Sequence, residues 1–371
     1  MTRNIQAFAS AFGQQDNLGD AILRRHMLNV LRKDCGLHIY TGTCSESYIE
    51  ALDLSPEDTA YDSVQAWLAS LAAAAIRGRT VFAYNTGEVS INRRFAASRL
   101  MSLPLRALQA FRGGAIIHIG QGIKVKPQPL WKAIGGIGLQ ASSFVAWRDR
   151  RSNLFMDAGL TAPDWAFVEL HERGFSNIAG RRGFITLSLR GDRPYPDAAW
   201  LSTVKQYADN NGLKIAVATQ VKRDSGHSTR LASDLNALLV DWTPSKSHAD
   251  QEADLRSLYA ESAVVVSDRL HVLVVSMAEG AVPVDASVKG NHKVRNTFAG
   301  AGLTINAYPR NFEAPTHGPS DGEHDKLLAS RPALVKQVPQ MMNAVEQLLS
   351  TLNSVVRTKT ARTRNVTGWP K

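Results

Sequence analysis

Arg269 and His271 have the residue types and the spacing to act together on one anionic ligand. They follow 263–266, a β-branched run typical of a buried parallel strand, and they precede apolar residues at helical spacing. Ser267 and Asp268 are expected to cap this helix, which places Arg269 and His271 in its first turn. Ligands of parallel α/β sheets bind beyond the carboxyl ends of strands, where helix N-termini attract anions. A cation and a titratable imidazole here fit an anionic ligand that also needs a proton.

A structural interpretation competes with the functional one at each of these positions. An arginine or histidine near a helix start often serves only as a cap or a surface group. His118 lies inside a predicted strand, where we expect a core histidine rather than a catalyst. The functional interpretation therefore requires that residues from other strands converge on the same place.

Strands and helices alternate along both halves of the chain. In the first half we predict strands at Asn4–Ser10, Leu37–Thr41, Thr80–Tyr84, Ala115–Ile119 and Ser143–Trp147, with helices at Ala21–Leu31, Ser55–Ile76 and Arg93–Phe111. In the second half we predict strands at Phe184–Leu189, Lys214–Thr219 and Ala237–Val240, with helices at Pro196–Asn211, Gly226–Asn236 and Asp250–Ala260. Since βαβ connections are almost always right-handed, Arg190 should reach the sheet edge that holds Arg269 and His271.

This alternation predicts an α/β protein with two Rossmann-like domains, whose parallel sheets face each other across a cleft as in the GT-B architecture. We place the N-terminal domain, the expected acceptor side, at 1–180 and the C-terminal domain, the expected donor side, at 181–330. A long apolar helix at 331–356 should pack back across both domains. The basic residues of 357–371 follow it as a tail with too little apolar content to fold. A polar loop is expected at Gly318–Glu323.

Two loops of the first half follow predicted strands and could contact a ligand. Asn17, Gly19 and Asp20 occupy a turn that opens a helix, where Asp20 can cap the helix or act as a base. The second loop, Gly120-Gln121-Gly122, lies where a parallel sheet places a ligand loop. Arg148 follows a further strand and could face the same ligand. The Gly-x-Gly-x-x-Gly spacing of dinucleotide-binding loops is absent from the first turn.

The formal net charge of +10 permits a nucleic-acid partner, but half of it lies in the tail from Arg357 onward. An anionic small ligand or an anionic membrane surface suits the remaining charge as well as nucleic acid does. The spacing of Cys35 and Cys44 indicates neither a disulfide framework nor a zinc site, so we expect no bound metal and a reducing cytoplasm. No signal peptide is recognisable. Peripheral contact with the inner face of a membrane is compatible with the tail, and the oligomeric state is not indicated.

The order of several short motifs resembles that of the polysaccharide pyruvyltransferase family. The resemblance runs from about Asn4 to about Phe298, and its motifs are Asn17-x-Gly19-Asp20-Ala21-Ile22-Leu23, Gly120-Gln121-Gly122-Ile123, Arg148-Asp149 with Ser152, Pro163-Asp164, Ser188-Leu189-Arg190, and Ser267-Asp268-Arg269-Leu270-His271 with Gly280-x-x-Pro283-Val284. The chain departs from the commoner family pattern in two places. It has Gly-Ala-Val-Pro for Gly-Val-Pro, and Asn291-His292 where Asp-Pro is frequent.

The resemblance implies transfer of pyruvate from phosphoenolpyruvate onto two hydroxyls of one sugar, which gives a pyruvate ketal in a cell-surface polysaccharide or its precursor. It implies that Arg190, Arg269 and Lys293 bind phosphoenolpyruvate, which is the donor substrate, so that no cofactor is needed. We predict His271 as the general acid and Asp20 as the base. The predicted acceptor-binding residues are Asn17, Gly19, Gln121 and Arg148. The acceptor sugar is not specified, and a lipid-linked form remains an alternative.

Two other function classes remain open at this point. A GT-B-type sugar-nucleotide glycosyltransferase would share the two-domain build, and Glu279 or Lys293 could then contact the nucleotide. A non-enzymatic binding protein for nucleic acid would use the positive charge, although we expect no nucleic-acid partner.

Overall fold

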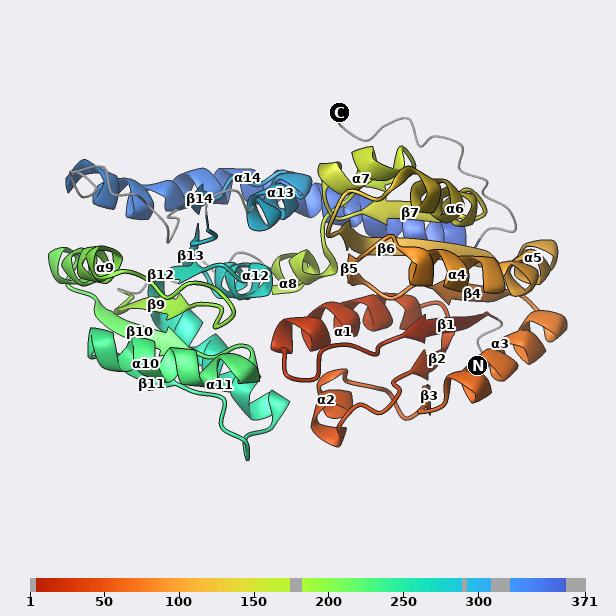
Figure 1. Cartoon of the computed structure of the whole chain (residues 1–371), viewed down its shortest axis with the longest axis horizontal. Coiled ribbons are helices and arrows are strands. Elements are labelled where there is room, and N and C mark those ends of the chain that lie inside the picture. Colours follow the sequence, from red (N-terminus) through yellow and green to blue (C-terminus); the bar gives the residue numbers. More distant parts are fainter. Residues whose placement is uncertain (1–4, 174–181, 289–291, 308–320, 358–371) are drawn as a thin grey trace. The chain divides into compact units, whose positions relative to one another are not determined.

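The computed structural model describes residues 5–173, 182–288, 292–307 and 321–357 (Figure 1). By its internal contacts the chain divides into two compact units. Unit 1 comprises residues 1–13, 23–165 and 344–371, and unit 2 comprises residues 14–22 and 166–343. The predicted domain boundary at 180 and 181 lies outside the described residues. Two features differ from the predicted domains. The first long stretch of unit 1 ends at Trp165, and Gln14–Ile22 belongs to unit 2.

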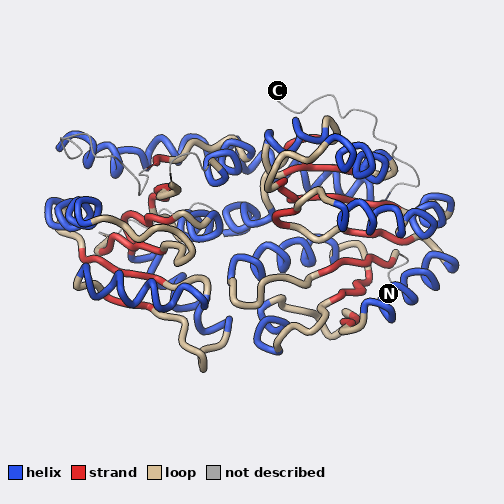
Figure 2. The backbone as a smooth tube through the Cα atoms, in the orientation of Figure 1, coloured by secondary structure: helices blue, strands red, loops and turns tan. Residues whose placement is uncertain are grey.

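Unit 1 is built on a parallel sheet in the strand order β3-β2-β1-β4-β6-β7-β8, with β5 paired to β6 (Figure 2). The central strands are rich in alanine, valine and isoleucine, as expected for strands that are covered on both faces. The strands are β1 (Gln6–Ser10), β2 (Gly36–Tyr40), β3 (Thr59–Tyr61), β4 (Thr80–Ala83), β5 (Gly87–Val89), β6 (Ala115–Ile123), β7 (Phe144–Trp147) and β8 (Leu160–Thr161).

The helices of unit 1 lie on the two faces of this sheet. Right-handed connections put α1 and α2 on one face, and α3 to α7 on the other, where α3 contacts α5, α4 contacts α5 and α6, and α6 contacts α7. These helices are α1 (Leu18–Arg32, which belongs to unit 1 from Leu23 onward), α2 (Glu46–Ala51), α3 (Val64–Arg77), α4 (Arg93–Met101), α5 (Leu103–Phe111), α6 (Pro129–Gln140) and α7 (Arg150–Met156). Buried Arg106 of α5 donates to the carbonyl of Gly138 near the end of α6, which accounts for a charged side chain in this layer.

Unit 2 is built on a second parallel sheet, in the order β11-β10-β9-β12-β13-β14 (Figure 2). The strands are β9 (Phe184–Ser188), β10 (Lys214–Ala218), β11 (Leu238–Val240), β12 (Ser262–Ser267), β13 (Val282–Asp285) and β14 (Asn306–Ala307). The helices are α8 (Val168–Arg173), α9 (Ala198–Asn210), α10 (Ser225–Leu235), α11 (His248–Glu261), α12 (Leu270–Ala278) and α13 (Lys293–Gly300), with short 3-10 turns at Trp165–Phe167 and Lys222–Asp224.

The last helix, α14 (Asp321–Arg357), contributes to both units: residues up to Asn343 belong to unit 2 and those from Ala344 to unit 1. It begins ten residues before the predicted start of the C-terminal helix at 331. Of the loop predicted at Gly318–Glu323, residues 318–320 lie outside the described residues and 321–323 are helical. The predicted tail beyond Arg357 also lies outside them. No helix in the described part of the chain is long and apolar enough to cross a membrane.

Several other predicted elements differ from those observed. The helix predicted at Ser55–Ile76 begins only at Val64, because strand β3 occupies 59–61. The helix predicted at Arg93–Phe111 is interrupted at Ser102. Gly120-Gln121-Gly122 is not a loop: these residues continue β6 to Ile123, and a register shift against β7 lies at Gly120. Short strands β5 and β14 were not predicted.

Leu187 and Leu238 provide a test of where the stability of unit 2 resides. Leu187 lies in the central strand β9 and is fully buried, whereas Leu238 on edge strand β11 is 52% exposed. Leu187→Ala should lower the free energy of unfolding by about 2–5 kcal/mol, because it removes buried methyl groups and leaves a cavity. Leu238→Ala should change it by less than about 0.5 kcal/mol. Urea unfolding of both variants measures the difference, and equal losses would contradict the assignment of β9 to the core.

Candidate functional site

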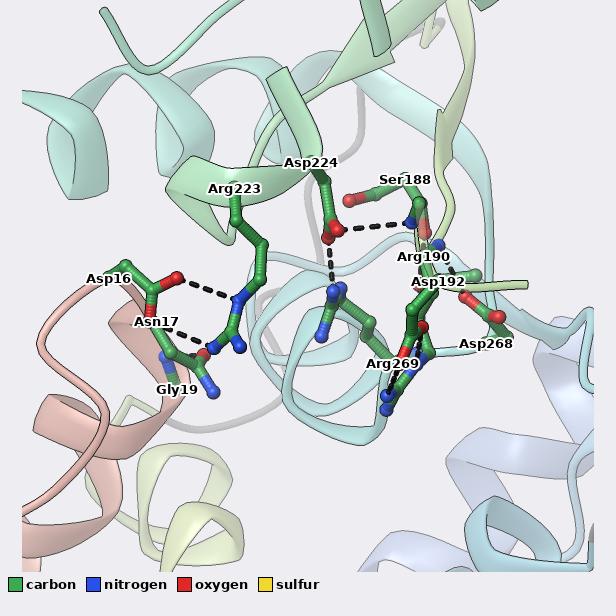
Figure 3. Close-up of polar contacts among 12 residues, drawn as sticks. Asp16, Asn17, Gly19, Ser188, Arg190, Asp192, Arg223, Asp224, Asp268 and Arg269 are labelled. Atoms are coloured by element: carbon green, nitrogen blue, oxygen red, sulfur yellow. Dashed lines mark hydrogen bonds and ion pairs between the residues drawn. The ribbon is translucent and has the colours of Figure 1, made fainter. Parts of the chain in front are cut away.

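The carboxyl ends of β9, β10 and β12 bring the predicted site residues of unit 2 together. Ser188 and Ser267 are register partners on the neighbouring strands β9 and β12. Arg190 and Arg269 each follow two residues later, so the two arginines leave the sheet from adjacent positions (Figure 3). The predicted convergence of these two side chains is therefore observed within one unit.

Arg190 is held by two aspartates. Its guanidinium donates to both carboxylate oxygens of Asp192, at 2.8 and 2.6 Å, and its backbone amide donates to Asp268 at 2.9 Å. The hydrogen bond from Arg190 holds the pKa of Asp192 well below its usual range. The Asp192 side chain is 58% exposed, so this pair lies at the surface.

Arg269 is held more deeply, by Asp224. The two side chains form an ion pair and are 13% and 5% exposed. The same carboxylate accepts a 3.0 Å hydrogen bond from the amide of Gly191. The pKa of the Arg269 guanidinium is lowered, mainly by burial. The nearby charge of Arg190 also lowers it, whereas the carboxylate of Asp224 raises it. Asp224 thus fixes Arg269 beside a second cation.

The segment Gln14–Ile22 packs against this edge of the sheet. Leu18 and Ile22 are buried in the core of unit 2. Asn17 forms an isolated antiparallel bridge with Val221, and the amide of Lys222 donates to the carbonyl of Asp16 at 2.8 Å. Figure 3 shows Arg223 reaching from the end of β10 to the carboxylate of Asp16, at 2.7 Å. These contacts explain why the segment belongs to unit 2.

His271 faces this segment at Gly19. A Cβ atom at Gly19 would lie only 2.6 Å from the Cβ and 2.7 Å from the ring carbon of His271, so any larger residue would displace the imidazole. His271 is in the first turn of α12, as predicted, but the N-cap is Arg269 rather than Ser267 or Asp268. The Ser267 hydroxyl accepts from the amide of Arg269, and Asp268 instead accepts from Arg190. The predicted acid and a predicted acceptor residue, 252 positions apart, are thus in contact.

The remaining predicted residues have different surroundings. Asp20 accepts from the amide of Gln14 and from the side chain of Asn17, and Asn17 accepts from the amide of Gly19, so all three stabilise the turn. Lys293 is the first residue of α13. Arg295 of the same helix lies 3.6 Å from Asp285 at the end of β13, and this contact brings Lys293 toward the same sheet edge.

Gln121 and Arg148 belong to unit 1, and both are buried. Gln121 donates to the carbonyl of Asn85, and Arg148 pairs with Asp164 at 3.3 Å. His118 is a core histidine, as predicted: it is 1% exposed and stacks on Tyr84 at 4.0 Å. The acceptor-binding role of Gln121 and Arg148 remains a prediction.

Sequence reasoning missed Asp224 and Arg223. Both lie in the run Lys222-Arg223-Asp224-Ser225, which begins four residues after Ala218, the last residue of β10. Because β10 neighbours β9 in a parallel sheet, the position of this polar run beyond a strand end was the available signal.

No protein-family profile matches the sequence, and a search of curated proteins gives no match either. Solved structures do match. A putative UDP-N-acetylglucosamine 2-epimerase from Listeria monocytogenes is similar with a TM-score of 0.54 and 10% identity, covering 95% of this chain and 96% of that chain. The UDP-GlcNAc 2-epimerase from Neisseria meningitidis, solved with UDP-GlcNAc, gives 0.54 at 11% identity, covering 94% and 99%. At this identity the similarity shows the fold alone and confirms the predicted class: two Rossmann-like parallel sheets in a GT-B-like fold.

His248 offers a pH-dependent test of how Gln14–Ile22 is held. Its ring Nε2 lies 2.6 Å from the carbonyl of Gln15, its ring packs edge-on against Trp242, and burial lowers its pKa below the ordinary value of 6.5. As the pH falls through 6.5 the unfolded chain takes up a proton before the folded one does. Stability should therefore decrease from pH 6.5 downward until the folded-state pKa is reached, by at most about 1.4 kcal/mol per pH unit.

Urea unfolding of the parent chain and of His248→Gln between pH 8 and pH 5 measures this slope. The variant should show the weaker dependence below pH 6.5. Identical slopes would mean that His248 titrates alike in both states.

Proposed function

We propose that the chain is an enzyme that transfers a group from a phosphate-bearing donor to a sugar, and that Arg190 and Arg269 bind the donor phosphate. The observation that carries this proposal is the pair of guanidinium groups beyond adjacent strand ends. Each guanidinium is already held by an aspartate, and since a guanidinium has five N–H donors, donors are left over for an anion. Guanidinium groups bind phosphate and carboxylate in bidentate geometry, which suits a donor that carries both groups.

Phosphoenolpyruvate is the donor that the chain's own residues favour. The first turn of α12 reads Leu270-His271-Val272 and contains no glycine. Sites that cradle a diphosphate on the backbone need glycine for its close approach. Side chains would meet the anion here, which suits a small ligand with one phosphate. The resemblance of the motif order to that of the polysaccharide pyruvyltransferase family supports the same donor.

In this mechanism His271 protonates the methylene carbon of phosphoenolpyruvate, and the neighbouring carbon becomes electrophilic to a sugar hydroxyl. Asp20 is the proposed base for that hydroxyl. Departure of inorganic phosphate lets a second hydroxyl of the same sugar close the ketal. Lys293 would add a third cation at the sheet edge, and Asn17 and Gly19 would contact the acceptor beside His271.

The second candidate is an enzyme that uses a sugar nucleotide, and the structural comparisons favour it over the first. One of the two matching structures is described as a putative UDP-N-acetylglucosamine 2-epimerase, and the other is a UDP-GlcNAc 2-epimerase solved with UDP-GlcNAc. The aspartates that surround the arginines could accept hydrogen bonds from ribose or sugar hydroxyls. Either donor would place its phosphate on the same two arginines.

A thermal-shift comparison distinguishes the two donors. Phosphoenolpyruvate at about 100 times its Kd should stabilise the protein by about 2.7 kcal/mol, whereas a panel of UDP-linked and other nucleotide sugars should not. Stabilisation by a nucleotide sugar alone would establish the second candidate instead.

Arg269→Met and Arg190→Met should each weaken donor binding by about 10- to 100-fold, because each removes charge-assisted hydrogen bonds to the phosphate. Lys205→Met is the matched control, since Lys205 is an exposed cation on α9 of the same unit and belongs to none of the ion pairs of the site. Titration calorimetry measures the Kd values. Unchanged binding in both arginine variants would remove the proposed phosphate site.

His271→Asn separates chemistry from binding. If His271 donates the proton, kcat for phosphate release in the presence of the acceptor should fall by about 10²- to 10⁴-fold, while the thermal shift with phosphoenolpyruvate is retained. Mass spectrometry of candidate glycans identifies the product, which gains the mass of one pyruvic acid less one water. Near-normal turnover by this variant would exclude His271 as the acid.

A further inference from the structure

The positive charge of the chain is concentrated in one part of unit 1. Residues 63–148 contain eleven lysine and arginine residues and a single acidic residue, Glu88. Their net charge of +10 equals that of the whole chain, so the rest of the chain is balanced. The charge of the C-terminal tail is therefore offset by acidic residues elsewhere in the chain.

The same part of the chain supplies the helices on one face of the unit 1 sheet. Residues 63–148 include α3, α4, α5 and α6, and α7 follows directly (orange to yellow in Figure 1). We call this layer of α3 to α7 and its connecting loops the basic face. Eight of its basic residues are exposed, and their side chains make no hydrogen bond or ion pair in the part of the chain that the structure describes: Arg77, Arg93, Arg94, Arg112, Lys124, Lys126, Arg150 and Arg151. The Glu88 carboxylate lies 3.6 Å from Arg148 and therefore does not neutralise these exposed residues.

Large apolar side chains are also exposed on the basic face. Thirteen large hydrophobic residues are exposed in the described part of the chain, and ten of them lie on α3 to α7 or on the loop before α6. Phe111 at the end of α5 is 87% exposed and Met101 at the end of α4 is 83% exposed. Scattered exposed hydrophobic residues are ordinary, but their concentration on one helical layer marks an interaction surface.

We propose that the basic face binds peripherally to the surface of an anionic phospholipid bilayer. The basic side chains would meet the lipid phosphates, and side chains such as Phe111 and Met101 would enter the boundary between headgroups and acyl chains. A nucleic acid would use the charge but would leave the aliphatic side chains exposed to water. This inference is independent of the donor site, because the basic face belongs to unit 1 and the two arginines to unit 2.

Vesicle flotation of the full chain tests the proposal. Binding is expected to phosphatidylcholine vesicles that contain phosphatidylglycerol, to weaken as salt is raised, and to be absent with phosphatidylcholine alone. Lys124→Glu/Lys126→Glu should lower the partition coefficient by about 25-fold or more, because each of the two charges near the surface contributes about fivefold. Met101→Ser/Phe111→Ser should lower it by a similar factor.

Matched controls lie in unit 2. Lys205→Glu/Lys214→Glu makes the same charge change at exposed positions of α9 and β10, and Leu238→Ser removes an exposed apolar side chain from β11. Both should bind vesicles as the parent chain does. Circular dichroism and unfolding midpoints check that every variant is folded.

Three results would overturn the proposal. The first is absence of binding to anionic vesicles by the parent chain. The second is complete loss of binding when residues 358–371 are removed, which would assign the contact to the tail. The third is binding to duplex DNA as tight as to anionic vesicles, with no effect of Met101→Ser/Phe111→Ser on either, which would identify a polyanion surface.

Discussion

The ion pair between Arg269 and Asp224 is the contact on which the arrangement of the site depends. Arg269 follows β12, Asp224 follows β10, and the amide of Gly191, which also donates to Asp224, follows β9. One buried carboxylate thus connects the ends of three strands. A buried ion pair gains little stability over apolar packing, but removal of one partner leaves an uncompensated charge, at a cost of about 3–5 kcal/mol. The main effect of the pair is therefore to fix the direction of the Arg269 guanidinium.

The segment Gln14–Ile22 imposes the second constraint. Its backbone pairs with the residues after β10, Leu18 and Ile22 enter the core of unit 2, and Gly19 lies against His271. A side chain at position 19 would push the imidazole out of its place. The absence of a Cβ atom therefore has a reason that lies in tertiary structure, because the turn itself does not require a glycine there.

The parts of the fold that follow from local pattern were predictable, and those that depend on distant contacts were not. β-branched runs identified β9 and β12, and the parallel register then placed Arg190 near Arg269. The same logic did not find Asp224, because a polar run after a strand resembles any surface turn. Gly120-Gln121-Gly122 resembled a loop, yet β5 and β7 pair with this stretch and keep it extended. Nothing within residues 14–22 indicates that they pack on a sheet built from residues beyond 183.

The charge balance of the site determines which arginine can respond to a ligand. Arg190, Arg193, Arg223 and Arg269 are matched in number by Asp16, Asp192, Asp224 and Asp268, so an entering phosphate must exchange ion pairs rather than fill a positive cavity. Asp192 is 58% exposed, and an exposed pair contributes about 0–1 kcal/mol, so Arg190 can leave it at little cost. Asp224 is buried, and Arg269 would leave an unpaired carboxylate behind. An anion would therefore recruit Arg190 and be aligned by an Arg269 that Asp224 already holds in place.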